Sequence, residues 1–535
     1  MKVEKIGKAL FGFSYALSFI ILIIIAFLNV FLTMCYTGSF TVRNPYFDMT
    51  AAIIGIIIAI AIMYALNRMT GFISRMKLKH VIMISIAFTA IIAFTWLTLS
   101  GFRDRGDGEN MMKIGFDIIR NDYHDKNYIY LQRYPYQSGV LIIMLPFIML
   151  FQNMNLNGVY LMMSYANIIL MIITMLNLIF IAKRLNGEKT AKWTALILMM
   201  FIPLPLSMIQ VYGNIMSLPL ITGMILLAIS INDNKPFKPF MMRILSILIL
   251  AIIAGFIKPN NMIIGIALTI SFILYACIHH IQLKKTIIMI IAGILIIPCM
   301  MTGKTIAVNS MEMISGIKFE QSEAQPMRNF IAMGLNDGSD HGKGFYYQEA
   351  GYAWTDAKTI NRNANETLSR QISKLTTNPL YAINFFSVKI AQTWAEPTFS
   401  YQVRVGNSIF LNVVNNKELQ GKMKLTAGEK IVTSSAFMVS TRTIADAACI
   451  IISIMALIGL PIAKRKHDIM AALPALCILG GFIFHVFWET QPEYAYTYFL
   501  LLIPYAGIGL EVLTDACNAV RKKREPAEGK DIIDA

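Results

Sequence analysis

The chain has 535 residues, of which 56% are apolar; adding the 33 glycines brings this fraction to about 62%, whereas soluble domains average about 45–50%. Charged residues make up 15%, against about 25% in soluble domains. This composition excludes a water-soluble globular protein. The formal charge of +16 comes from basic residues in short segments between apolar runs, so it indicates membrane orientation, and we expect no nucleic-acid partner.

Apolar runs long enough to cross a bilayer as helices recur along the whole chain. They predict an all-α polytopic membrane protein. The first run follows Lys2, Lys5 and Lys8 and is longer than the apolar core of about 7–15 residues in a cleavable signal, so we expect a retained helix. The runs lie near residues 10–34, 50–66, 81–100, 158–182, 193–209, 215–232, 242–257, 260–278, 286–303, 441–463, 467–488 and 496–516.

Basic residues in short loops favour the cytoplasmic side of a membrane. With twelve crossings, every such loop faces the cytoplasm together with both termini. We expect the membrane to be the cytoplasmic (plasma) membrane of a bacterium. This orientation holds only if the short apolar run 139–151, which contains Pro146, stays at the outer surface or re-enters it. The alternative is that this run spans and another predicted span is wrong.

The predicted map divides the chain into six parts, and both large polar parts lie on the external face. In the second of these, a glycine-rich turn at 334–344 precedes a helical pattern from about 360 to 394. The parts are 1–100 (N-terminal transmembrane helices), 101–157 (external loop with juxtamembrane helices), 158–303 (transmembrane helices), 304–440 (mixed external domain), 441–520 (C-terminal transmembrane helices) and 521–535 (basic cytoplasmic tail).

The loop after the third predicted span contains the first candidate for chemistry. Glycines flank Asp107, and an acid at the mouth of a membrane cavity can have its basicity raised by apolar walls. We predict that Asp107 is a general base and that Glu109 binds substrate. The alternative is that Asp104, Asp107 and Glu109 are solvated loop charges or helix caps.

A tyrosine-rich stretch follows at 128–139 and includes Arg133, Tyr134 and Gln137. Tyrosine is common at the membrane interface because its ring is apolar and its hydroxyl is hydrated. An interfacial belt is therefore one interpretation. The other is that the stretch lines a site for a sugar or a lipid headgroup.

The order of these motifs, followed by a short apolar run, a basic loop and an external Tyr212-Gly213-Asn214, resembles the GT-C integral-membrane glycosyltransferases. The similarity is to the branch that contains protein O-mannosyltransferases and the aminoarabinose transferases of lipid A. It implies a GT-C-like bundle of about twelve transmembrane helices with a juxtamembrane helix. Asp107 matches the acid of the first external loop in that superfamily. Asn214 stands where a second acid often follows, and this departure weakens a paired-carboxylate mechanism.

The end of the second external region contains Lys389, Trp394 and Glu396. A cation that neutralises a phosphate and an indole that stacks on a sugar would suit a phosphate-linked sugar. The alternative is that Trp394 anchors the interface and Lys389 is a helix-end charge.

Near the last span, Glu489 and Tyr494 match a position where relatives carry an acid followed by an Arg-Tyr pair. The arginine is missing in this chain, so another cation must hold the lipid phosphate. The candidates are Lys258, Arg133, Lys389 and Arg404.

The resemblance implies transfer of a sugar from a polyprenyl-phosphate donor to a cell-envelope acceptor on the external face, with inversion. Substrate would reach the site partly through membrane lipid, and we expect no cofactor and no obligatory metal. One alternative is a transporter or flippase of lipid-linked or polar solutes, for which repeat symmetry and midplane charges are typical. Others are a cell-surface polysaccharide polymerase with several external arginines and a non-catalytic scaffold.

Overall fold

A computed structural model of the protein shows a chain built almost entirely of helices. One antiparallel pair of short strands joins β1 (Met34–Tyr36) to β2 (Pro45–Phe47), with Cys35 opposite Tyr46. The predicted all-α class is confirmed. The residues that the structure describes are 2–36, 45–101, 106–122, 125–231, 236–279, 282–337, 342–346, 357–406 and 425–524.

Ten helices among the described residues are long and apolar enough to cross a membrane. An apolar helix suits a bilayer because it satisfies all of its backbone hydrogen bonds internally. The ten spans lie in α1 (Lys2–Phe31), α2 (Met49–Arg75), α3 (Leu78–Ser100), α7 (Leu156–Asn186), α11 (Phe237–Ile257), η3–α12 (Pro259–Ile278), α13 (Leu283–Ser315), twice in α20 (Ser435–Phe487), and in α21–α22 (Pro492–Phe499 and Ile503–Arg524).

The two remaining predicted spans differ from an ordinary crossing helix. The run 193–209 is broken between α8 (Glu188–Met200) and α9 (Pro203–Leu206), where the axis bends by 56°. Counting this bent pair as one span gives eleven. The run 215–232 corresponds to α10 (Gly213–Ile229), which at 17 residues is a shorter apolar helix.

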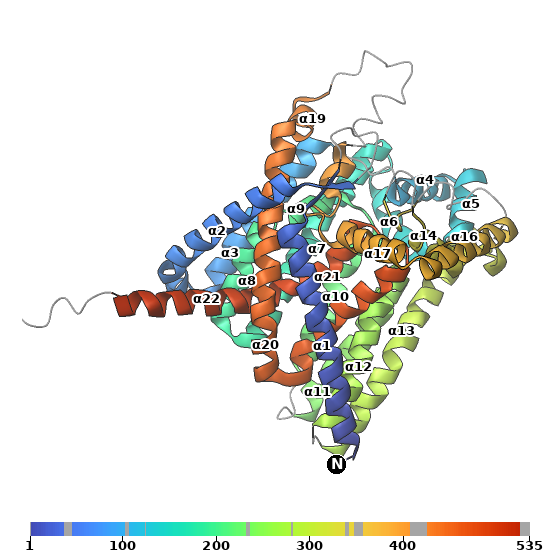
Figure 1. Cartoon of the computed structure of the whole chain (residues 1–535). Coiled ribbons are helices and arrows are strands. Elements are labelled where there is room, and N and C mark those ends of the chain that lie inside the picture. Colours follow the sequence, from blue (N-terminus) through green and yellow to red (C-terminus); the bar gives the residue numbers. More distant parts are fainter. Residues whose placement is uncertain are drawn as a thin grey trace, which may run out of the picture.

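The helix α20 folds back against α22, although its backbone is helical throughout. Gly459 lies against the carbonyl of Tyr505, and Gly481 lies against the ring of Tyr498. On straight helices the two glycines would be about 33 Å apart and the two tyrosines about 10 Å. The helix must therefore bend between its two spans, so both halves pack on the same partner (Figure 1).

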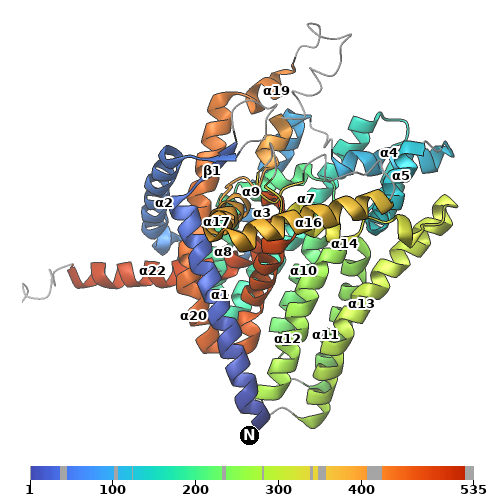
Figure 2. The same ribbon diagram turned by 45° about the vertical axis from the view of Figure 1, so that its right-hand side comes forward.

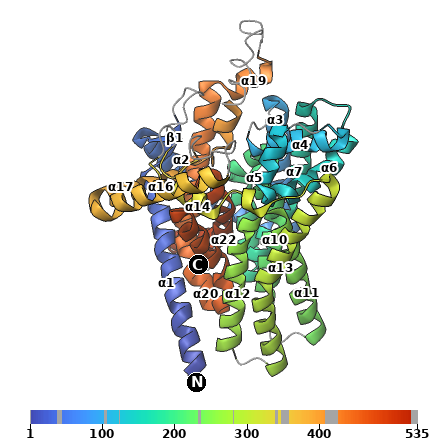
Figure 3. The same ribbon diagram turned by 90° about the vertical axis from the view of Figure 1, so that its right-hand side faces the viewer.

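Close glycine contacts join α11 to α13 in a reciprocal way. A Cβ atom on Gly255 would lie 2.1 Å from the carbonyl oxygen of Met300, and one on Gly303 would lie 1.9 Å from that of Ile252. Small residues let helix backbones approach in a membrane, where packing drives association. Figure 3 shows α11, α12 and α13 running side by side.

Short helices form a layer at the end of the bundle away from the N-terminus (Figure 1). This layer contains helices from both large polar regions of the sequence. An ion pair links the two regions, with Arg133 from the first and Glu323 from the second. Its members are α4 (Asp107–Arg120), α5 (Asp125–Arg133), α6 (Ser138–Leu150), α14 (Met327–Gly334), α16 (Ala357–Thr377) and α17 (Pro379–Trp394). The predicted surface segment 139–151 is α6.

The second polar region differs from its prediction in two ways. The helix α13 continues to Ser315, past the predicted end of its span, and carries the chain into this region. The described parts of 304–440 contain helices and turns, so the predicted mixed domain is helical where the structure describes it. The helical pattern at 360–394 is confirmed, with a break at Asn378 before Pro379. Figure 2 shows α16 and α17 lying across the membrane-crossing helices.

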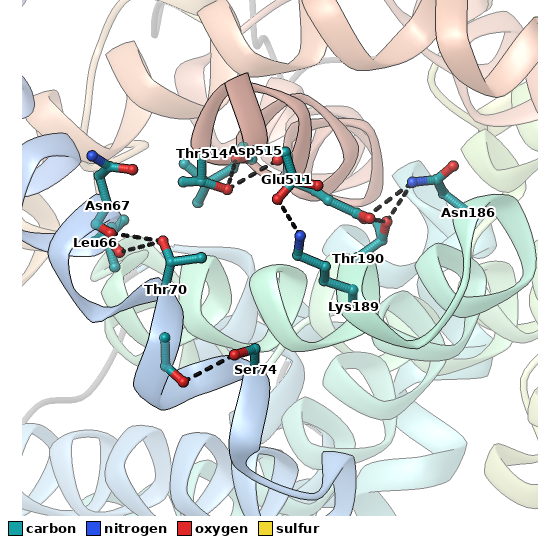
Figure 4. Close-up of polar contacts among 12 residues, drawn as sticks. Leu66, Asn67, Thr70, Ser74, Asn186, Lys189, Thr190, Glu511, Thr514 and Asp515 are labelled. Carbon is teal, nitrogen blue, oxygen red and sulfur yellow. Dashed lines mark hydrogen bonds and ion pairs between the residues drawn. The ribbon is translucent and has the colours of Figure 1, made fainter. Parts of the chain in front are cut away.

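A polar network joins α8 and α22 (Figure 4). The Glu511 carboxylate accepts hydrogen bonds from the Thr190 hydroxyl and from Asn186 Nδ2, and Lys189 pairs with Asp515. The Cβ position of Gly507 lies against Thr194 Oγ1, so the two helices cross closely. These contacts fix the helices at the end where the short basic loops lie.

Candidate functional site

Asp107 is the first residue of α4 and is exposed to solvent. The next residue, Gly108, packs where a Cβ atom would lie 3.2 Å from both Tyr160 Oη and the Val211 carbonyl oxygen. The Val211 amide in turn donates to Tyr160 Oη at 3.0 Å. This close approach of α4 to the segment before α10 places Asp107 beside Tyr212.

Tyr212 links Asp107 to a buried amide. Its hydroxyl donates to Asp107 Oδ2 at 3.3 Å and accepts from Gln137 Nε2 at 2.5 Å. Gln137 is held in place because the neighbouring Gly139 packs against the carbonyl of Phe256 at the end of α11. The two hydrogen bonds that run from Gln137 through Tyr212 to Asp107 therefore orient the Asp107 carboxylate by means of two separate segments of the protein.

Lys258 lies at the break between α11 and η3 (Pro259–Asn261), half-buried between two tyrosine rings. Its Nζ is 5.4 Å from the ring centre of Tyr212 and 5.6 Å from that of Tyr494. Within the described chain it makes no hydrogen bond or ion pair. The pKa of Lys258 is lowered to about 8, because burial disfavours the charged ammonium more than the nearby Glu493, Asp107 and Glu489 favour it.

Glu489 enters the same cluster from the turn between α20 and α21. Its backbone amide donates to the Phe330 carbonyl at 2.9 Å, and its carboxylate lies 3.5 Å from Tyr494 Oη. The pKa of Glu489 is raised to about 8, because burial and the carboxylates of Asp107 and Glu493 together outweigh the lowering by Tyr494 and Lys258. Asp107, Lys258 and Glu489 thus converge from three distant parts of the sequence.

Aromatic rings surround this cluster of charges. Tyr134 contacts Tyr136 with ring centres 5.8 Å apart, Tyr136 contacts Phe330 at 6.3 Å, and Phe330 stacks on Trp488 at 5.3 Å. Three of these four residues, Tyr134, Tyr136 and Phe330, come from the two polar regions that were predicted to share one face. Such rings suit a sugar face or the apolar part of a lipid headgroup.

Tyr346 is a member of the site that sequence reasoning missed. It is 38% exposed, and Asp107 and Glu489 both lie near enough to raise the pKa of its hydroxyl, after the larger effect of burial. Gly342 and Gly344, with φ of +106° and +73°, provide the turn that leads to it. The glycine-rich turn was visible in the sequence, but nothing there indicated which helices it would approach. Tyr212 was likewise not predicted as a site residue, although the motif Tyr212-Gly213-Asn214 was noted for its Asn214.

Lys389 is placed differently from the prediction that it contacts a phosphate. Its ammonium is fully buried and donates to the carbonyls of Val486 and Trp488, each at 2.9 Å, and to that of Gly334. An ammonium group has three hydrogens. Two of them are used at the C-terminal end of α20 and the third at the C-terminal end of α14, where a cation is also favoured by the helix dipole. The helix-end interpretation of Lys389 therefore fits.

Trp394 and Glu396 also lie away from the cluster, within the packed interior. Trp394 is 2% exposed, its carbonyl accepts from Asn29 Nδ2 at 3.2 Å, and its ring packs on Phe482. Glu396 accepts from Thr398 Oγ1 at 2.8 Å and from the Ser400 amide at 2.6 Å. Neither side chain is open to a sugar, which corrects the predicted stacking role of Trp394 and the binding role of Glu396.

The other predicted binding residues form ion pairs or lie beside the cluster. The Arg133 guanidinium donates to Glu323 Oε2 at 2.8 Å, and Arg404 pairs with Glu493. Glu109 pairs with Lys113 at 2.9 Å on the same helix. Asn214 follows Tyr212 and is 4% exposed. Asp104 lies outside the described residues.

Among the residues that the structure describes, no three His, Cys, Asp or Glu side chains lie close enough to hold a metal ion. The chemistry that the described residues themselves offer is proton transfer at Asp107 and charge neutralisation at Lys258.

The many membrane-length helices, with polar chemistry gathered at one end of the bundle, define a polytopic integral membrane protein. The chain belongs to the family described as conserved hypothetical integral membrane protein, whose profile matches residues 4–494. That match covers nearly all of the described helices, including α4, α10 and the turn with Glu489. No curated protein sequence matches the chain at a significant level.

Proposed function

We propose that the protein is a GT-C-like membrane glycosyltransferase that moves a sugar from a polyprenyl-phosphate donor to a cell-envelope acceptor. The observation that supports this most is the convergence of an exposed acid, Asp107, with a half-buried cation, Lys258, inside a ring of aromatic side chains. Acid, cation and aromatic faces are the groups that such a transfer needs.

The proposed reaction is a single inverting displacement. The acceptor hydroxyl oxygen attacks the anomeric carbon of the sugar, and the bond from that carbon to the phosphate oxygen breaks. Asp107 takes the acceptor proton, and the lipid phosphate leaves with its negative charge facing Lys258. The hydrogen bond from Tyr212 would hold Asp107 in position for this step.

The proposed site faces the outside of a bacterial cytoplasmic membrane, with both termini in the cytoplasm. The basic short loops support this orientation. A lipid carrier also suits the architecture, because the isoprenoid tail enters from the bilayer while the acceptor arrives from water. In this orientation the helices α6, α16 and α17 would lie at this boundary.

Removal of the proposed base tests the function directly. Purified protein is incubated with a panel of polyprenyl-phosphate sugars that carry a radiolabelled sugar, and release of label from the lipid to envelope acceptors is measured. We expect wild-type turnover on at least one donor. Asp107→Asn should lower turnover by about 10²–10⁴-fold, the usual contribution of general-base assistance.

Asp117→Asn makes the same change on the same helix away from the cluster and should leave turnover unchanged. Wild-type transfer by Asp107→Asn would overturn the assignment of the base. A transporter or flippase would move the lipid across a membrane without releasing label. Activity only with lipid-diphosphate donors would favour a polymerase.

A further inference from the structure

The N-terminus of α10 opens beside the charged cluster. Tyr212 precedes it in an extended conformation and makes no side-chain capping hydrogen bond. In the described chain, the backbone amides of Gly213 and Asn214 make no hydrogen bond. The first amides of a helix carry partial positive charge, and they attract anions when no cap satisfies them.

A buried amide side chain sits at the same helix end. Asn214 is 4% exposed, and its Nδ2 has no hydrogen-bond partner among the described residues. A buried donor without an acceptor costs about 1–3 kcal/mol. Folded proteins leave few such donors unpaired, so this one points to a ligand that supplies the acceptor.

A cation completes this group of donors. Gly213 packs against Lys258, since a Cβ atom on Gly213 would lie 3.4 Å from Lys258 Cβ. A larger residue at 213 would hold Lys258 away from the helix end. The ammonium of Lys258 lies beside the Tyr212 and Tyr494 rings. The carboxylates of Glu493, Asp107 and Glu489 lie in its neighbourhood, but among the described residues none of them forms an ion pair or hydrogen bond with it. Two backbone amides, a carboxamide and an ammonium therefore lie at one helix end without a paired acceptor among the described residues.

We infer that the N-terminus of α10, Asn214 and Lys258 together form a phosphate site that holds the headgroup phosphate of the lipid donor. The identity of the lipid rests on the proposed function, whereas the anion site rests on the donors alone. An aspartate at 214 would place a negative charge among these donors and repel phosphate. Asparagine at this position is therefore what lets the helix end bind an anion.

The test is binding of farnesyl phosphate to the full-length protein in detergent, measured beside farnesol and inorganic phosphate. Asn214→Asp changes one atom and the charge, and Lys258→Gln removes the cation. We expect each change to weaken farnesyl phosphate binding at least about 10-fold, as for loss of a hydrogen bond or ion pair to a charged group. Farnesol binding should stay at its wild-type level.

The control is Asn378→Asp, the same change at the N-terminus of α17, where the side chain accepts from the Tyr381 amide as an aspartate also would. It should bind farnesyl phosphate as wild type does. If Asn214→Asp fails to fold, Asn214→Ala removes the donor without adding charge and is judged by the same threshold.

Wild-type affinity of Asn214→Asp or Asn214→Ala for farnesyl phosphate would overturn the site. Equal losses for farnesol would overturn it too, because they would show a general effect on the lipid tail. Competition by inorganic phosphate would support a site for the phosphate group itself, free or lipid-borne. Phosphate-dependent binding without sugar transfer would contradict the proposed function but would still support the anion site.

Discussion

At the scale of single residues, two lysines show how burial alone leaves function undecided. Lys389 and Lys258 were equal candidates for a phosphate in the sequence. Lys389 has all of its hydrogens on carbonyls at a helix end, whereas Lys258 lies between two rings without such acceptors. The first ammonium stabilises the fold, and the second is available to an anion.

This contrast predicts opposite outcomes for the same substitution. Lys389→Met should lower the free energy of unfolding by about 2–5 kcal/mol, because it leaves buried carbonyls without donors. Lys258→Met should leave stability near wild type, because it removes a partly desolvated charge without breaking a hydrogen bond, and should weaken farnesyl phosphate binding. Thermal unfolding in detergent measures the first effect. Equal loss of stability in both variants would contradict the division of roles.

At the scale of elements, close helix crossings decide where the site residues lie. The reciprocal contacts of Gly255 and Gly303 hold α11 against α13, and α11 ends at Lys258. Gly139 fixes α6, and with it Gln137, against the same end of α11. The position of Lys258 relative to Tyr212 thus depends on backbone contacts that only glycine permits.

Enlarging one of these glycines should therefore loosen the bundle. Gly303→Val places side-chain atoms against the backbone of α11 and should lower stability by about 1–3 kcal/mol or more, as overpacking does. Gly12→Val is the control, because Gly12 has no neighbouring atom within 4 Å. Thermal unfolding of both purified variants measures the difference. A Gly303→Val protein as stable as Gly12→Val would show that the crossing is not tightly packed.

At the scale of the whole molecule, the polar layer and the short basic loops occupy different ends of the bundle. The layer contains α4, α5, α6, α14, α16 and α17, and the loop between α7 and α8 belongs to the network around Glu511 (Figures 1 and 4). The proposed site therefore lies at one end of the bundle. The charge pattern predicts that this end faces outward.

Cysteine labelling in intact cells checks that orientation. In a Cys517→Ser background, Thr377→Cys at the exposed end of α16 should react with a membrane-impermeant maleimide added outside. Gln282→Cys, exposed before α13, should react only after the cells are permeabilised. The reverse pattern would place Asp107 in the cytoplasm and remove the basis for a lipid-linked donor on the outer face.

The sequence alone determined the class of protein and most of its spans, because a bilayer-crossing helix is a local, compositional signal. It also identified Asp107, Gln137, Lys258 and Glu489 as candidates. Tertiary structure decided which candidates meet. Lys258 lies beside the ring of Tyr212, whose hydroxyl donates to Asp107, whereas Lys389 and Trp394 are buried in the packed interior. Tertiary structure alone brought in Tyr346 and left the Asn214 Nδ2 without a hydrogen-bond partner among the described residues. The reason is physical: a site is made by side chains from distant segments, and their approach depends on helix crossings and bends that no local pattern records.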